Sequence, residues 1–98
     1  MRVLLATRDL FFRSKLAAVV TAGGAELVAR DAPCDLVVQD VEAPGAAERI
    51  RGLVDGGVAV LAYGPHVGAE LLRAAREAGA TAVPNSEVER VLAERIRG

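Results

Sequence analysis

The sequence predicts an α/β domain, in which a mainly parallel five-stranded sheet has helices on both faces. Short apolar runs alternate along the chain with segments of helical periodicity, the pattern of a three-layer, doubly wound sheet. Glycines follow three of the helical segments, at residues 23–24, 56–57 and 79, where helices commonly end. The length of 98 residues corresponds to one domain, spanning residues 1–98.

Five apolar runs are the predicted strands. They span residues 3–6, 26–29, 35–39, 58–62 and 81–83. The clearest of them are continuous runs of Val, Leu and Ala rather than alternating apolar and polar residues. Such runs indicate strands that are covered on both faces, as in a parallel sheet.

The first two helices are marked by their flanking residues. Asp9 can cap the first helix, which buries Phe12 and Leu16 and ends at residues 23–24. The second helix begins near Pro44, since proline favours the first turn.

The third helix follows residues 64–65, and we expect its inward face to carry Val67, Leu71, Ala74, Ala75 and Ala78. The fourth helix covers the remaining residues from Val88 onward. Only a few residues, which include 31–34, separate the second and third strands, whereas a parallel crossover needs about a dozen residues or more. A very short strand, an antiparallel strand and an irregular edge all remain open. We favour a shrunken edge strand with the second crossover helix missing.

The overall charge excludes several functions. The formal net charge is −1, so no long-range field attracts nucleic acid or an anionic membrane.

Cys34 is the only cysteine, which excludes an intramolecular disulfide and favours a cytoplasmic protein. Lys15 is the only lysine among twelve basic residues, a bias that suits a thermophile or a GC-rich genome equally well.

Three motifs carry a family resemblance. Asp40 ends the third predicted strand and is followed by Pro44-Gly45; the opening strand leads into polar residues at 7–9; and Glu-Ala-Gly-Ala at 77–80 precedes the last strand. Together these motifs resemble the response-regulator receiver (CheY-like) domains, which have a flavodoxin-like fold. The resemblance implies that Asp40 occupies the place of the phosphoaccepting aspartate in a two-component system.

The other residues of that family's site are replaced. Receivers hold Mg²⁺ with two acidic residues after the first strand, where this chain has Thr7 and Arg8. Their Ser or Thr falls at about Tyr63 or Gly64, and their lysine falls at residues 83–85, where no basic residue stands. The resemblance therefore implies a divergent pseudo-receiver.

Arg8 and Asp40 follow adjacent predicted strands, so we expect their side chains to lie together. A guanidinium beside Asp40 can pair with the carboxylate and would repel Mg²⁺. We therefore predict no cofactor, with Mg²⁺ possible only if Asp9 and Asp40 cooperate. The alternative partner for Asp40 is a helix N-terminus.

Ligands of open α/β sheets bind beyond the carboxyl ends of the strands. The residues expected at this edge are Thr7, Arg8, Asp9, Asp40, Glu42, Tyr63 and His66. His66 could join Asp9 and Asp40 as a metal ligand, could contact an anion beside Arg8, or could simply open a helix on the surface. The spacing of these residues has no diagnostic metal-ligand pattern.

The predicted function is a non-catalytic, receiver-like signalling or protein-interaction module. No nucleophile–base pair is evident, so no catalytic residue and no enzyme activity are predicted. The expected partner is another protein or a second copy of the chain. The resemblance to receivers implies residues 71–97 as one contact face. Leu10 or Phe11 is another, because one helical face cannot bury three consecutive bulky residues. Two alternatives stay open: a small-ligand or anion sensor at the carboxyl edge, and a phosphoacceptor that uses Asp40.

Overall fold

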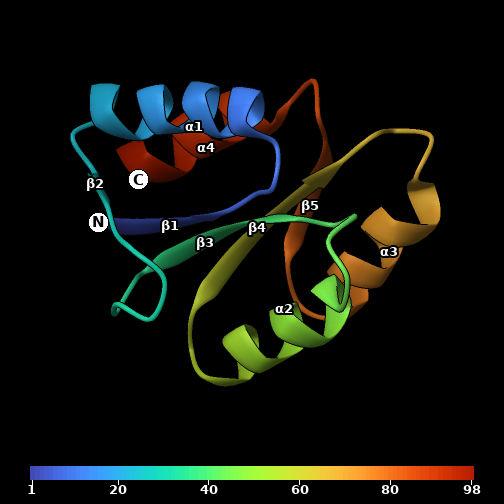
Figure 1. The fold of residues 1–98 in the computed structure, drawn as a ribbon. Helices are drawn as coiled ribbons and strands as arrows, with labels where there is room; N and C mark the ends of the chain where they lie inside the picture. Colours follow the sequence, from blue (N-terminus) through green and yellow to red (C-terminus); the bar gives the residue numbers. More distant parts are fainter.

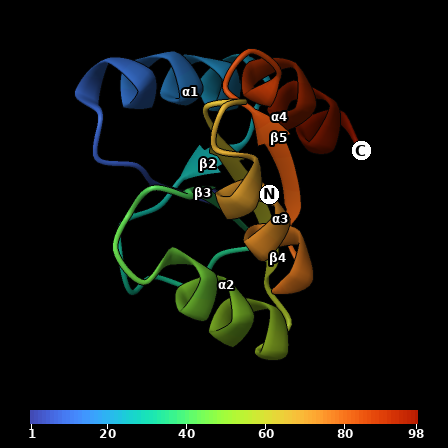
Figure 2. The same cartoon turned by 90° about the vertical axis from the view of Figure 1, so that its right-hand side faces the viewer.

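The computed structural model describes all residues, 1–98, and has the predicted α/β architecture. The sheet order is β2-β1-β3-β4-β5 and every strand pair is parallel. Helices α1 and α4 cover one face of the sheet and α2 and α3 cover the other (Figures 1 and 2). In chain order the elements are β1 (Arg2–Ala6), α1 (Leu10–Ala22), β2 (Glu26–Leu27), β3 (Leu36–Asp40), α2 (Ala46–Asp55), β4 (Ala59–Gly64), α3 (Ala69–Glu77), β5 (Thr81–Pro84) and α4 (Val88–Arg97).

Two apolar cores lie on the two faces of the sheet. On the α1/α4 face, Leu5 of β1 packs with Leu16 of α1 and Leu92 of α4. On the α2/α3 face, Val37 of β3 packs with Ile50 of α2 and Leu72 of α3. Side chains of one strand alternate between the two cores because successive residues point to opposite faces.

The expected shrunken edge strand is confirmed. β2 has two residues, shorter than the predicted 26–29, and it pairs in parallel with the start of β1. No helix connects it to β3. The chain returns through residues 28–35, where the amide of Asp35 donates to the carbonyl of Arg2 and its carboxylate accepts from the Arg2 amide at 2.7 Å. The hydrogen bond from the Arg2 amide to the carboxylate is the main cause that lowers the pKa of Asp35 below 3.8.

The short β2 leaves the outer edge of β1 partly unpaired. The carbonyl of Val3 still accepts from the amide of Val28, but Leu5 lies beyond the end of β2. Arg13 of α1 reaches over and donates from Nη1 to the Leu5 carbonyl at 2.9 Å. A side chain thus supplies the hydrogen bond that a longer edge strand would supply.

One predicted helix face is wrong in part: Ala75 and Ala78 are buried as expected, but the two larger residues are not. Val67 and Leu71 were expected to point inward, but they are 81% and 43% exposed. α3 begins only at Ala69, and the residue that it buries is Leu72, together with Ala75. Leu71 and Leu72 are adjacent and most of the remaining apolar residues are alanines, so periodicity alone does not distinguish the two faces.

None of the four helices is long and apolar enough to span a membrane.

Candidate functional site at the carboxyl edge of the sheet

The predicted ion pair between Arg8 and Asp40 is present. Arg8 follows β1 and Asp40 ends the adjacent β3, so parallel pairing brings both to the same edge. Arg8 Nε lies 3.6 Å from Asp40 Oδ2. The Asp40 side chain is 13% exposed and that of Arg8 is 59% exposed, so an exposed guanidinium pairs with a nearly buried carboxylate.

The other oxygen of Asp40 is also occupied. Oδ1 accepts a hydrogen bond from the backbone amide of Glu42 at 2.8 Å, which tightens the turn after β3. The turn continues through Pro44 to Gly45, whose φ of 70° favours glycine, and α2 begins one residue later. Both carboxylate oxygens therefore have partners within the chain, an amide and a guanidinium.

Thr7 lies where the resemblance to receivers leads one to expect a metal-binding acid. Its side chain is hydrogen-bonded to Tyr63. The Tyr63 hydroxyl donates to Thr7 Oγ1, and the Tyr63 ring stacks on Phe12 of α1 with centroids 4.8 Å apart. Burial raises the pKa of Tyr63 to about 12, the Thr7 hydrogen bond opposes that rise, and the carboxylates of Asp40 and Asp9 add to it. Tyr63 thus closes the edge with a neutral, packed side chain.

The residues at this edge do not fit a divalent cation. Asp9 Oδ1 accepts from the amides of Phe11 at 2.9 Å and Phe12 at 3.1 Å, so the predicted helix cap is present and its carboxylate serves α1. Asp40 is neutralised by Arg8. No group of three or more His, Cys, Asp or Glu side chains is placed to hold a metal ion, so the structure does not bring His66 together with Asp9 and Asp40.

Gly64 ends β4 and is one of the two positions, with Tyr63, where the resemblance places the Ser or Thr of the receiver family. The Val41 side chain, buried on the α2/α3 face, fills the space beside it. A Cβ atom at position 64 would collide with Val41 Cγ2. Any hydroxyl-bearing residue here would require Val41 to move. The sequence carries no signal for this contact, because Val41 and Gly64 are far apart in the chain.

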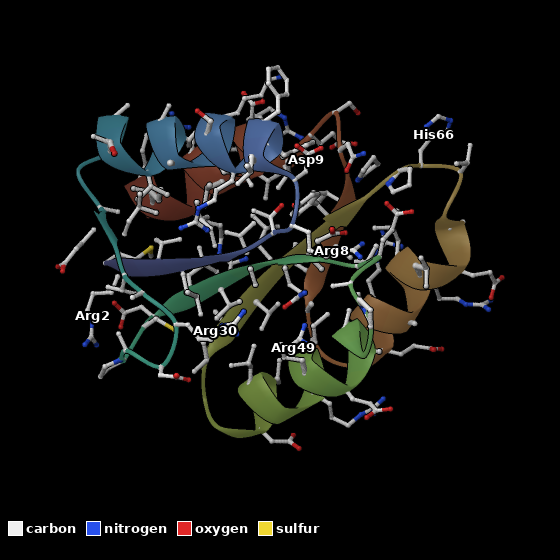
Figure 3. All side chains as sticks on the ribbon, viewed as in Figure 1. Arg2, Arg8, Asp9, Arg30, Arg49 and His66 are labelled. Carbon is white, nitrogen blue, oxygen red and sulfur yellow. The ribbon has the colours of Figure 1, made fainter.

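The remaining predicted residues contribute less. His66 is exposed on the loop between β4 and α3, and it points away from Arg8 (Figure 3). Glu42 contributes its backbone amide, as described above, whereas its side chain makes no hydrogen bond or ion pair. At the end of β5, the backbone amide of Asn85 donates to the Gly64 carbonyl at 2.8 Å. The edge therefore assembles Thr7, Arg8, Asp40 and Tyr63, with Asp9 beside them.

Comparison with solved structures gives the fold family. NtrX from Brucella abortus is 17% identical with a TM-score of 0.80, and the match covers 98% of this chain and 26% of NtrX, so this chain spans about a quarter of that length. The receiver domain of the response regulator TorR is 15% identical with a TM-score of 0.82, covering 98% of this chain and 92% of that one. The beryllofluoride-activated NtrC4 receiver domain dimer is 15% identical with a TM-score of 0.71, covering 97% and 98%.

The chain has the receiver fold. The resemblance stated from Asp40 and its Pro-Gly pair is thereby confirmed at the level of the fold. No protein-family model matches the sequence, and no curated protein is similar to it in sequence. At 15–17% identity the likeness concerns the fold, and the chemistry of the edge must be argued from its own residues.

Proposed function

We propose that residues 1–98 form a receiver-like signalling domain that works by binding a protein and is not phosphorylated in a Mg²⁺-dependent way. The observation that carries the proposal is the ion pair between Arg8 and Asp40. It places a fixed positive charge against the one carboxylate that corresponds to a phosphoacceptor. The domain is a binding module and not an enzyme.

Phosphoryl transfer to a carboxylate requires cations that neutralise the transferring group. Arg8 is a cation, but its charge is already balanced by Asp40. A metal ion would have to approach past the guanidinium, with Asp9 engaged in capping α1. The attacking oxygens of Asp40 also have partners, from the Glu42 amide and from Arg8. These contacts support a carboxylate that organises the edge rather than one that reacts.

The partner is a protein, either another chain or a second copy. Two exposed apolar features support this. Leu10 and Phe11 at the start of α1 are 81% and 70% exposed, and Leu71 on α3 is also exposed, within the 71–97 face. Among the structures with this fold, the NtrC4 receiver is described as a dimer. An edge sensor for small anions has less support, because Arg8 is paired and His66 lies apart.

The test is a phosphorylation assay with acetyl phosphate and Mg²⁺, followed by intact-mass measurement. A receiver domain that is known to accept the phosphoryl group, treated in parallel, provides the positive control. We expect no phosphoryl adduct on this chain. An adduct that disappears in Asp40→Asn would overturn the proposal, because the asparagine side chain could still accept from the Glu42 amide but could not form an acyl phosphate.

A second measurement tests the metal argument separately. The variant Arg8→Asp with Thr7→Asp restores acidic residues beside Asp40, and we expect it to bind Mg²⁺ where the parent chain does not. Titration with Mg²⁺ followed by amide NMR shifts at residues 7–9 and 40–42 reports this. Saturable Mg²⁺ binding by the unmodified chain at those amides would contradict the role given to Arg8.

A further inference from the structure

A groove of about 700 Å³ lies on the α2/α3 face where the second crossover helix is missing. Its floor is the sheet at β1 and β3, one wall is α2, and its ends are the return loop and the β3–α2 turn. We call it the open groove. The residues that line it are Leu4, Leu5, Ala6, Thr7, Arg8, Arg13, Val28, Ala29, Arg30, Asp31, Val37, Gln39, Ala43, Pro44, Arg49 and Leu53.

The floor of the open groove is an unfinished apolar core. Leu4 and Ala6 of β1 and Leu53 of α2 pack against the buried core of the α2/α3 face, yet each is only partly buried. Parallel sheets occur with both faces covered, because their strands are apolar on both sides. On the α2/α3 face, no helix of the chain covers this strip of β1.

A buried amide on this floor also lacks a partner. Gln39 of β3 is fully buried, and its Nε2 donates to the Asp40 carbonyl at 3.0 Å. Its Oε1 accepts no hydrogen bond. Buried acceptors are nearly always satisfied in finished cores, so the orphaned oxygen is a second sign that the floor is incomplete.

The rim of the open groove is positively charged. Four arginines line it, Arg8, Arg13, Arg30 and Arg49, against the single acid Asp31. Arg8 is paired with Asp40 and Arg13 with the Leu5 carbonyl. No carboxylate lies within ion-pair distance of Arg30 or Arg49, and the two enter the groove from its end and from its α2 wall (Figure 3). The one hydrogen bond of the Arg49 side chain is a long one, from Nη2 to the Pro44 carbonyl at 3.5 Å.

The dimensions suit a short helix. β1 has five residues, which at roughly 3.3 Å per residue span about 16 Å. A helix rises 1.5 Å per residue, so about eleven residues, or three turns, cover that length. This matches the crossover of a dozen or so residues that the chain lacks.

We propose that the open groove docks an amphipathic, acidic helix supplied by a partner protein, which takes the place of the missing crossover helix. Its apolar stripe covers Leu4, Ala6 and Leu53, and its carboxylates pair with Arg30 and Arg49. The inference rests on the protein-binding role proposed above and names the surface and the chemistry of the partner. The docked helix also reaches Thr7 and Arg8 at the carboxyl edge, since both line the groove.

The test uses a designed peptide of about twelve residues, held helical by an i,i+4 lactam, with leucines on one face and glutamates flanking them. Binding to the full chain is followed by amide NMR shifts. We expect saturable binding with a dissociation constant below about 1 mM and shifts at residues 4–6, 30–31 and 49–53. The same peptide with lysine in place of glutamate should bind at least about tenfold more weakly.

Charge reversal gives the matched variants. Arg30→Glu with Arg49→Glu should weaken binding of the acidic peptide by at least about tenfold and strengthen binding of the lysine peptide. Arg51→Glu with Arg97→Glu changes the net charge equally, outside the groove, and should leave both affinities within about twofold. The switch between peptides also separates a lost contact from a misfolded variant, because a misfolded chain would bind neither.

Other occupants are distinguishable outcomes. Shifts confined to the groove with inorganic phosphate or adenosine monophosphate, without peptide binding, would show a small-anion site and overturn the proposal. Self-association that is lost in Arg30→Glu with Arg49→Glu would assign the groove to a second copy and also overturn it. Failure of the peptide to bind leaves the phosphorylation result at Asp40 unaffected, and phosphorylation of Asp40 leaves groove binding unaffected, so the two proposals fail separately.

Discussion

The two faces of the sheet differ in how completely they are covered. On the α1/α4 face, two helices that pack on each other enclose a core with Leu16, Val20, Val88 and Leu92 fully buried. On the α2/α3 face, the helices lie over β3, β4 and β5, and the strip over β1 stays partly exposed. One missing crossover helix accounts for the difference.

This comparison shows how a receiver fold tolerates the loss of a helix. The sheet keeps its order and all its parallel pairs, because β1 is held between β2 and β3 and rests on α1. Local side chains replace what the helix and a longer β2 would have provided: Arg13 serves the Leu5 carbonyl, and Asp35 ties the returning chain to Arg2. Two features are not compensated in this way: the open groove, and the Gln39 Oε1 atom that accepts no hydrogen bond.

The largest expected effect comes from two neighbouring leucines of β1. Leu5 is buried on the complete face, whereas Leu4 is partly exposed in the open groove. Leu5→Ala should lower the free energy of unfolding by about 2–5 kcal/mol, because it leaves an enclosed cavity. Leu4→Ala should cost about 1–2 kcal/mol, mainly lost apolar burial. Urea unfolding followed by circular dichroism measures both, and equal losses would mean that the groove floor is as well packed as the other core.

The next effect concerns the close contact at the carboxyl edge. Gly64→Ser should destabilise the chain by about 1–3 kcal/mol, because the new side chain meets Val41. Val41→Ala makes room, so the double variant should be more stable than the sum of the two single losses predicts, by about 1 kcal/mol or more. Strict additivity in this double-mutant cycle would show that Val41 is not what excludes a side chain at position 64.

Tyr63 gives a pH dependence on the complete face. The folded chain holds the phenol proton up to a pKa of about 12, against 10.0 for the unfolded chain. The contribution of the protonated Tyr63 to the free energy of unfolding is therefore fully present below pH 10. It is lost between pH 10 and 12, at about 1.4 kcal/mol per pH unit. In Tyr63→Phe this part of the alkaline loss should be absent, although the stack on Phe12 is kept. Urea midpoints at pH 9 to 12 for both chains test it, since all other groups titrate alike in the two.

The smallest effect tests the open edge of β1. Arg13→Gln should cost about 1 kcal/mol, because the Leu5 carbonyl loses its donor beside the short β2. Arg51→Gln removes an exposed arginine of α2 that makes no such contact and should change stability by less than about 0.5 kcal/mol. A loss for Arg13→Gln no greater than for this control would indicate that solvent serves the Leu5 carbonyl equally well.

Local patterns in the sequence were sufficient for much of the fold and part of the site. Continuous apolar runs marked the strands, and the short connection between the second and third strands predicted the missing helix. Asp9 was recognisable as a cap because Asp directly before a helix can accept hydrogen bonds from the free amides of the first turn. The Arg8–Asp40 pair followed from strand adjacency alone, since neighbouring parallel strands end at the same edge.

Contacts between distant residues could not be predicted in this way. The facing of Leu71 and Leu72 depends on where α3 begins relative to the sheet. The separation of His66 from the edge depends on the course of the β4–α3 loop, and the exclusion of a side chain at Gly64 depends on Val41. None of these leaves a pattern along the chain, because each is a matter of three-dimensional packing.

The alternation of elements, the parallel sheet and the charges at the carboxyl edge follow from the order of the residues, because apolar periodicity and capping act over short ranges. Three features depend on the folded chain: both oxygens of Asp40 are engaged, the Tyr63 hydroxyl bonds to Thr7, and the missing helix leaves an apolar groove edged by Arg30 and Arg49. Those features arise where segments distant in sequence meet, so their energies depend on packing that no local pattern records.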